Sequence, residues 1–213
     1  MREGDGFGRY ARLDVSRETL ESLKRLEIET LKWSAAINLI ARGTESELWS
    51  RHIQDSAQLL DAAPAGFSTW CDIGAGGGFP ALVLAILCRD RSPSPRFALI
   101  ESDRRKCAFL KLQVAELGLS ADVFNSRIES LPPFHADVVS ARALASLPAL
   151  LGHAFRQLAS GGVCLFPKGR SWREEVELAR RSWQFEFEPV PSIVDPDSAV
   201  LVIRNLRPME TDR

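Results

Sequence analysis

The chain has 213 residues and a formal net charge of −1, with an isoelectric point of about 6.3. This length fits one domain, or a domain with a small extension, and the charge excludes a constitutively basic nucleic-acid binder, so any RNA contact must come from a local patch or a partner's surface. The longest apolar run, 81–88, is far shorter than the ~20 residues of a membrane helix, and the polar residues 1–5 are unlike a signal peptide, so we expect a cytoplasmic protein without a membrane segment.

The N-terminal part of the sequence is predicted to be helical. Leucines recur at helical spacing within residues 16–40, which fits one long helix or two short ones. Residues 44–47, Thr-Glu-Ser-Glu, have the spacing of a capping box, and apolar residues follow at helical intervals over 49–60 before Pro64 ends the element. We therefore expect residues 1–66 to form a helical extension that packs on the rest of the chain.

From residue 68 the sequence alternates between strand and helix patterns. Strands are predicted at 69–73, 96–100, 122–125, 137–140 and 163–166, with helices at 79–88, 104–117 and 146–158 and a turn at Gly161-Gly162. After a helix near 173–181, the runs 184–187 and 199–204 flank a turn and are expected to close the sheet as an antiparallel pair. The prediction is an α/β, Rossmann-like fold: a mostly parallel seven-stranded sheet with helices on both faces, spanning 67–207 and forming one structural unit with the extension.

A glycine-rich turn follows the first predicted strand. Residues 72–80 read Asp-Ile-Gly-Ala-Gly-Gly-Gly-Phe-Pro, so Gly74, Gly76 and Gly78 can take left-handed conformations and let a ligand approach the backbone. The turn lies at a strand's carboxyl end, where open α/β sheets bind ligands. One frame, 76–81, fits the dinucleotide fingerprint G-x-G-x-x-A. The other, acid-x-G-x-G-x-G, resembles the S-adenosylmethionine loop of Rossmann-like methyltransferases, and Asp72 favours it because a carboxylate attracts that cofactor's cationic end and repels phosphates.

Later strand ends supply further candidates for cofactor contacts. Glu101 directly follows the second strand, where its carboxylate could accept hydrogen bonds from both ribose hydroxyls, or could be an acid at a helix start. Ile128 and Glu129 follow the third strand, where they could meet the face and the amino edge of an adenine; the alternative for Glu129 is a solvated loop charge. Arg142 follows the fourth strand and points into the same crevice, either to hold a carboxylate or phosphate or to form a surface ion pair.

The predicted N-terminal helices carry candidates for substrate contacts. Arg51, His52 and Asp55 share one helix face, although an Arg–Asp pair four residues apart is also common on solvated helices. Asn38 is an amide between apolar neighbours and needs hydrogen-bond partners, which loop backbone could supply.

A stretch near the C-terminus carries a local surplus of positive charge. Residues 156–181 hold six lysines and arginines, Lys168 among them, against three glutamates. This predicts either a modest basic patch that suits a phosphate backbone or a solvated helix face.

Motifs of several other methyltransferases are missing. Enzymes that methylate exocyclic amines usually place an acid or Asn before Pro-Pro-aromatic after the fourth strand, whereas this chain has Ser140-Ala141-Arg142-Ala143 there and a Leu-Pro-Pro-Phe only before that strand. No cysteine follows a proline at a strand end, so covalent attack on a pyrimidine carbon is not expected. The four cysteines stand singly and predict reduced core thiols and no metal site. The remaining target is a nucleophile that needs no deprotonation.

Six segments together resemble one family, the bacterial small-subunit ribosomal RNA methyltransferase G, also called glucose-inhibited division protein B. The segments are 38–39, 51–56, 72–80, 126–129, 141–147 and 168–169, within a resemblance that runs from Trp33 to Arg204. The chain departs from the family pattern at Ile40, where threonine is common, and at Ala81, where glycine is usual.

The resemblance implies a class I methyltransferase fold, S-adenosylmethionine as cofactor and N7-methylguanosine in 16S rRNA as product. Cofactor contacts are implied for Gly74, Phe79, Ile128, Glu129 and Arg142. The expected partner is 16S rRNA within a small-subunit particle, with no membrane and no metal involved.

The implied reaction needs no general base, because N7 of neutral guanine carries a free lone pair. Asp55 or Asn38 would accept hydrogen bonds from the guanine Watson–Crick edge, and Arg51, His52 and Lys168 would hold phosphates. Two alternatives stay open: a Rossmann domain that binds a nucleotide for regulation without catalysis, and a dehydrogenase, for which no separate substrate domain is visible.

Overall fold

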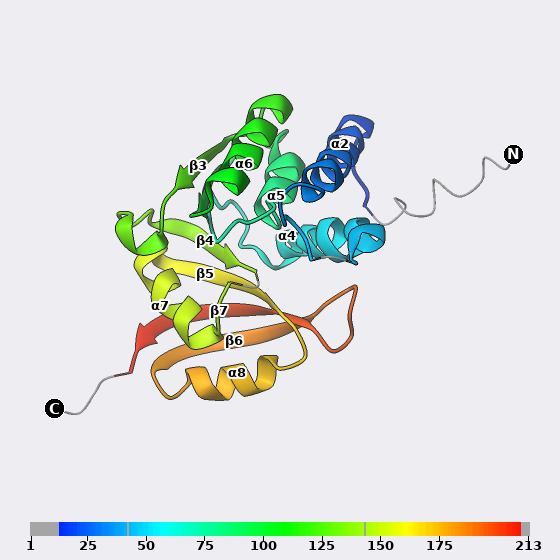
Figure 1. Cartoon of the computed structure of the whole chain (residues 1–213). Coiled ribbons are helices and arrows are strands. Elements are labelled where there is room, and N and C mark those ends of the chain that lie inside the picture. The colour runs from blue at the N-terminus through cyan, green and yellow to red at the C-terminus, as the bar shows by residue number, and fades with distance from the viewer. Residues whose placement is uncertain (1–12, 42, 143, 210–213) are drawn as a thin grey trace, which may run out of the picture.

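The computed structural model describes residues 13–41, 43–142 and 144–209 (Figure 1). The first part of the predicted extension, 1–12, lies outside the described residues, and the division of the chain at residue 66 stays a prediction. No helix in the described part is long and apolar enough to cross a bilayer. The four cysteines are free and buried, as predicted.

A mostly parallel, seven-stranded sheet forms the centre of the described chain. Its strands are β1 (Thr69–Ile73), β2 (Arg96–Glu101), β3 (Ala121–Asn125), β4 (Ala136–Ala141), β5 (Leu158–Lys168), β6 (Trp183–Pro191) and β7 (Ala199–Pro208). The order is β3-β2-β1-β4-β5-β7-β6, and β7 runs antiparallel to both of its neighbours. The chain leaves β1 toward β2 on one side and later returns to β4 on the other, so a ligand crevice is expected at the carboxyl end of β1.

Helices cover both faces of this sheet, as predicted (Figure 1). Helices α5 (Ala81–Cys88) and α6 (Arg104–Leu117) pack on one face, and α7 (Leu147–Gln157) and α8 (Trp172–Ala179) pack on the other. Each face of the sheet has its own apolar core: the first core lies under α5 and α6, and the second core lies under α7 and α8. In β1, Trp70 is buried in the first core and its neighbour Cys71 in the second, because successive strand residues point to opposite faces. Helix α6 ends at Gly118, whose φ of 61° is left-handed.

The N-terminal helices share a core with the sheet. Helix α2 (Arg17–Ser34) begins where the Ser16 hydroxyl accepts a hydrogen bond from Thr19 N at 3.2 Å. Leu23 and Leu26 of α2 are fully buried in the cluster that also contains Trp70. The extension and the sheet therefore bury apolar side chains against each other.

The prediction of a regular helix over residues 49–60 is wrong in detail. A 3-10 turn (Glu45–Glu47) leads into a π-helical segment (Trp49–Gln54), followed by the short helices α3 (Asp55–Ala57) and α4 (Leu59–Ala62). The predicted capping box does not form, because the Thr44 hydroxyl donates to the Ala41 carbonyl at 2.7 Å and does not cap the turn. Inserted π turns are frequent at functional sites.

Strand β5 also differs from the prediction. It starts at Leu158 and runs through the glycine pair that was predicted as a turn. Gly161 has a left-handed φ of 77°, and the register between β4 and β5 shifts near Ala136, so the glycines lie in an irregular part of the ladder.

Candidate active site

The glycine turn lies at the carboxyl end of β1, as predicted. The backbone N–H groups of Gly74 and Ala75 both donate to the Ile100 carbonyl at 2.9 Å, which fixes the turn on the end of β2. Gly76 has a left-handed φ of 55°, and a Cβ added there would lie no nearer than 3.7 Å to another group, the Gly74 carbonyl. The turn therefore presents bare backbone to open space, which is the cradle that a ligand needs.

Glu101 braces this turn from the neighbouring strand. Its Oε2 accepts from Gly76 N at 3.0 Å, and its Oε1 accepts from Ser102 N and Asp103 N at 2.7 and 2.8 Å. Asp103 caps α6 by accepting from Arg105 N at 2.8 Å, so Glu101 is not the capping residue. Glu101 Oε2, which accepts one hydrogen bond, keeps acceptor capacity beside the crevice.

Asp72 lies beneath the turn and is 1 % exposed. Trp70 Nε1 donates to Ser140 Oγ at 2.8 Å, and Ser140 Oγ donates to Asp72 Oδ1 at 2.6 Å. Burial raises the pKa of Asp72 to about 7, although the Ser140 hydrogen bond and the positive charge of Arg142 oppose this. A buried carboxylate that is costly to ionise gains most from a nearby cation.

The predicted adenine contacts lie on the other side of the crevice. Ile128 is 7 % exposed and packs in the second core, while the Glu129 side chain is exposed. A Glu129 carboxylate oxygen lies 3.7 Å from His153 Nε2, and the Glu129 carbonyl accepts from Arg156 at 3.4 Å. Ile128 therefore offers a buried apolar edge and Glu129 an exposed charge.

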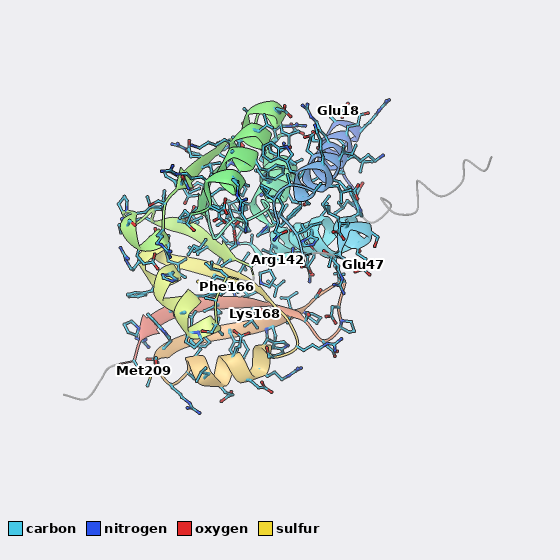
Figure 2. All side chains as sticks on the ribbon, in the orientation of Figure 1. Glu18, Glu47, Arg142, Phe166, Lys168 and Met209 are labelled. Carbon is cyan, nitrogen blue, oxygen red and sulfur yellow. The ribbon has the colours of Figure 1, made fainter. Side chains whose placement is uncertain are left out.

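Arg142 and His52 form a polar contact between the sheet and the N-terminal helices. One guanidinium nitrogen of Arg142 lies 3.0 Å from His52 Nδ1, and the other donates to the Arg51 carbonyl at 2.8 Å. Because a guanidinium only donates, Nδ1 must accept and the imidazole proton lies on Nε2, which is buried without a hydrogen-bond partner in the described chain. Figure 2 shows Arg142 between these helices and the β5 residues Phe166 and Lys168.

This environment keeps His52 neutral. Burial, together with the positive charges of Arg142 and Arg51, lowers the pKa of His52 to about 3. The ring also packs on Phe79 of the glycine turn, with ring centroids 5.1 Å apart. A neutral imidazole whose acceptor nitrogen already faces Arg142 carries no charge for a phosphate and has no free lone pair for a proton.

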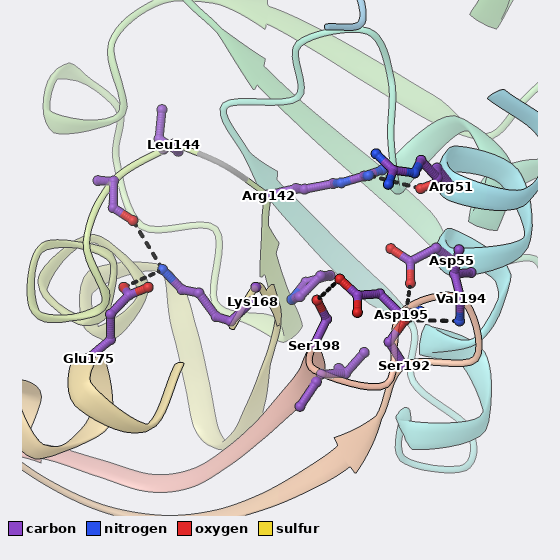
Figure 3. Close-up of a pocket in the computed structure, with 15 residues that line it drawn as sticks. Arg51, Asp55, Arg142, Leu144, Lys168, Glu175, Ser192, Val194, Asp195 and Ser198 are labelled. Carbon is purple, nitrogen blue, oxygen red and sulfur yellow. Dashed lines mark hydrogen bonds and ion pairs between the residues drawn. The ribbon is translucent and has the colours of Figure 1, made fainter. Parts of the chain in front are cut away.

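A pocket of about 520 Å³ opens beside Arg142 (Figure 3). Its lining comes from the π-helical segment and α3, from the loop after β4, from the end of β5, from α8, from the β6–β7 loop and from the start of β7. The residues are Arg51, Asp55, Arg142, Leu144, Ala145, Pro167, Lys168, Gly169, Glu175, Ser192, Val194, Asp195, Ser198, Ala199 and Val200. Its volume is in the range of small-molecule sites, and it combines apolar walls with charges of both signs.

Asp55 faces this pocket from the helical segment. Its Oδ1 accepts from Ser192 Oγ at 3.1 Å, and burial raises its pKa against the effects of Arg142 and Ser192. The sequence suggested an Arg51–Asp55 pair, but the Arg51 guanidinium pairs with Glu47 at 2.7 Å. The face shared by Arg51, His52 and Asp55 is thus divided among three different contacts.

Of the two remaining substrate candidates, Lys168 lines the pocket together with Asp55, and Asn38 does not. Asn38 is exposed between buried neighbours and forms no hydrogen bond within the described residues. Lys168 is 9 % exposed, and its ammonium donates to Glu175 at 2.8 Å and to the Ala145 carbonyl at 3.1 Å. Other cations of the predicted basic patch are also engaged, in Arg170–Asp197, Arg180–Glu177 and Arg173–Trp172 contacts.

Sequence reasoning missed four residues of the site. Ser140 lies at the end of the fourth strand, beside Asp72 of β1, so its place near the crevice could have been inferred. Leu144 lies within the family segment 141–147, which is the only signal for it, and Glu175 and Ser192 have no pattern that could mark them, because their contacts come from distant parts of the chain. No cluster of three or more His, Cys, Asp or Glu side chains suited to a metal occurs in the part of the chain that the structure describes.

A glycine turn at the switch point of the sheet, bonded to Glu101 of β2 and with the Asp72 carboxylate of β1 buried beneath it, fits the class of Rossmann-like S-adenosylmethionine-dependent methyltransferases. The structure is similar to cofactor-bound Rv0187 from MTB, with a TM-score of 0.62, 16 % identity and 94 % coverage of each chain. The structure is also similar to a SAM dependent methyltransferase from Aquifex aeolicus, with a TM-score of 0.57 and 15 % identity over 84 % of this chain and 97 % of that one. At these identities the likeness shows the fold alone.

Sequence comparison gives the family. Residues 19–199 match the sequence profile described as rRNA small subunit methyltransferase G. Proteins named ribosomal RNA small subunit methyltransferase G are 50 % identical in Cereibacter sphaeroides, over 92 % of this chain and 95 % of that one, and 48 % identical in Ruegeria sp., over 95 % and 98 %. The chain belongs to this family, as the resemblance predicted, and is an enzyme that uses S-adenosylmethionine. The regulator and dehydrogenase alternatives fall away.

The residues of the crevice fit this cofactor. The open backbone at Gly76 leaves space for it, and the buried Asp72 carboxylate suits a cationic amino group. The Glu101 carboxylate lies where it can accept hydrogen bonds from ribose hydroxyls. Ala81, the departure from the family pattern, is fully buried at the start of α5.

Proposed function

We propose that this chain transfers a methyl group from S-adenosylmethionine to N7 of a guanine in 16S rRNA of the small ribosomal subunit. The observation that carries the proposal is the pocket beside Arg142, which adjoins the glycine turn and offers a carboxylate, cations and apolar walls to one base. The names of the family and of its relatives supply the RNA class. An rRNA substrate also favours the cytoplasm as the place of action.

The cofactor supplies an electrophilic methyl group on a sulfonium. In the proposed arrangement Asp72 attracts its ammonium group, Glu101 accepts from its ribose hydroxyls, and Ile128 and Glu129 contact its adenine. Arg142 borders the cofactor side of the pocket. The burial and hydrogen bonds of these side chains support the proposed roles, and in this arrangement the methyl group would face the pocket.

On the substrate side, Asp55 is our candidate acceptor for the N1–H and amino group of guanine. Ser192 holds one of its oxygens and leaves the other open to the pocket, so the carboxylate is oriented before the base arrives. Asn38, which is exposed, is the alternative acceptor. Arg51 at the pocket rim is about half exposed and is our candidate for a phosphate contact.

No general base is required, because guanine N7 presents a lone pair. Orientation alone can lower a barrier by about 7–11 kcal/mol, so the chain's task is to hold the base and the methyl donor in line. The neutral, Arg142-facing His52 supports this reading, and it favours a positioning role for His52 over the phosphate contact that the sequence suggested.

We further propose that the substrate is a folded small-subunit particle. The net charge of the chain is −1 and the 156–181 stretch has a surplus of only three positive charges, so few phosphate contacts are available and affinity for short free RNA should be weak. A folded particle adds shape and further contacts.

The test is methyl transfer to purified small subunits and to protein-free 16S rRNA, both lacking the modification. N7-methylguanosine should appear by mass spectrometry in RNA from the subunits and form slowly in protein-free RNA. A methyl group on an exocyclic amine or a pyrimidine carbon would refute the N7 assignment. Equal rates on both substrates would refute the proposal that the folded particle is the substrate.

A further inference from the structure

The loop between β4 and α7 separates the glycine turn from the pocket. It carries Arg142 at its start and Leu144 beyond it. Leu144 is 44 % exposed, lines the pocket and lies directly on the turn, since a Cβ added to Gly74 would be only 2.8 Å from Leu144 Cδ1. Any movement of this loop changes the boundary between cofactor and substrate.

The loop is held at both ends by side chains from other elements. At its start, Arg142 is fixed by His52 and the Arg51 carbonyl. At its end, Lys168 donates to the Ala145 carbonyl at 3.1 Å, and Glu175 Oε2 accepts from Leu147 N at 2.8 Å.

The second anchor is a built network. The same Glu175 oxygen receives the Lys168 ammonium at 2.8 Å, and the two side chains are only 9 % (Lys168) and 23 % (Glu175) exposed (Figure 3). One carboxylate on α8 thus ties the end of β5 to the first residue of α7. Charge-assisted hydrogen bonds shielded from water are among the stronger ones in proteins.

We propose that Glu175, acting with Lys168, is a positioning residue for methyl transfer: the pair clamps the β4–α7 loop so that Arg142 and Leu144 border the reacting base and methyl group. The inference rests on the proposed function, because it takes this pocket as the site of transfer. A shift of about 1 Å in such groups can cost a hundredfold in rate, although the residue at fault never touches the substrate.

The clamp gives Lys168 a different task from a phosphate contact. Two of its three ammonium protons already point to Glu175 and Ala145. If Lys168 held a phosphate, its loss would weaken RNA binding. It would also reduce the salt slope, the slope of log affinity against log salt concentration, by about one. If it clamps the loop, its loss slows transfer and leaves RNA affinity nearly unchanged.

The experiment compares Glu175→Gln and Glu175→Ala with Glu174→Gln, which removes the same charge from an exposed neighbour on α8. Single-turnover transfer to small subunits is measured at saturating cofactor, with dissociation constants for S-adenosylhomocysteine and for the subunits measured separately. We expect about a tenfold slower step in Glu175→Gln, which can still accept from Leu147 N, and about a hundredfold in Glu175→Ala. Both affinities should change by no more than about twofold, a split that simple destabilisation would not produce.

Lys168→Met and the double variant Lys168→Met/Glu175→Gln form a double-mutant cycle with Glu175→Gln and the wild type. The double variant should be no slower than the slower single variant, because the two residues act as one unit. Glu175→Gln and Glu175→Ala rates equal to that of Glu174→Gln would overturn the clamp, as would a loss that lies entirely in RNA affinity. If Glu175→Ala does not fold, Glu175→Gln decides. A wild-type enzyme that forms no N7-methylguanosine would instead refute the proposed function.

Discussion

Replacement of Asp72 by asparagine should make the protein more stable at high pH while it weakens cofactor binding. The carboxyl group is fully buried, and its pKa is raised to about 7 from the ordinary 3.8, chiefly by burial. The folded state therefore binds this proton more tightly than the unfolded chain does. Such a group stabilises the fold at low pH and costs stability as the pH rises toward 7.

The magnitude follows from the shift. About three pKa units at 1.36 kcal/mol per unit correspond to about 4 kcal/mol when Asp72 is fully ionised. Between pH 5 and pH 8 the free energy of unfolding of the wild type should fall by about 2–3 kcal/mol relative to that of Asp72→Asn. The fall is smaller than the full ~4 kcal/mol because Asp72 already destabilises the fold in part at pH 5. His52 changes stability in the opposite sense over part of this range, since its pKa is lowered. It contributes equally to both proteins, so it cancels in the difference.

The assay is chemical denaturation of the wild type and Asp72→Asn at pH 5 and pH 8, without cofactor. Asp61→Asn, an exposed carboxylate on α4, controls for the loss of one negative charge. The advantage of Asp72→Asn over the wild type should grow by about 2–3 kcal/mol from pH 5 to pH 8. An advantage that is the same at both pH values would refute a raised pKa. Affinity for S-adenosylmethionine should fall about tenfold or more, because a charge-assisted contact is lost.

Three further outcomes are expected. S-adenosylhomocysteine should stabilise the fold by about 2.7 kcal/mol at a hundredfold excess over its Kd, and NAD should not; a thermal shift with NAD alone would contradict the cofactor assignment. Gly76→Val should abolish that shift, because its side chain fills the open face of the turn, and retained binding in a calorimetric titration would place the cofactor elsewhere. Arg51→Ala should lower the salt slope of particle binding by about one with little change in the transfer rate; an unchanged slope would remove Arg51 from the phosphate contacts.

The parts of the fold that were predictable are those with local signals. Alternating strand and helix patterns, and the glycines after β1, placed the sheet and the crevice, because a turn of bare backbone at a strand end has a strong sequence signature. The antiparallel pair formed by β6 and β7 was predicted from a turn between two apolar runs, and the structure confirms it.

The parts that failed depend on contacts between distant residues. Spacing over 49–60 fits a regular helix, yet the chain forms a π-helical segment there, and Arg51 pairs with Glu47 in place of Asp55. The pKa of His52 depends on Arg142, and the Lys168 ion pair depends on the packing of α8. A charge count over 156–181 cannot show that most of its cations are already engaged.

The central claim is that transfer depends on placement and electrostatics and needs no proton acceptor. The measurement is single-turnover transfer to small subunits against pH, at saturating cofactor, in the wild type and His52→Gln. Because the pKa of His52 is lowered to about 3, the imidazole stays neutral throughout, and neither rate profile should show a titration of His52 near the ordinary histidine pKa of ~6.5. The glutamine variant should keep a residual rate with the same profile. A bell-shaped wild-type profile with a limb near that pH, lost in His52→Gln, would show that His52 is an acid–base catalyst and would contradict the account.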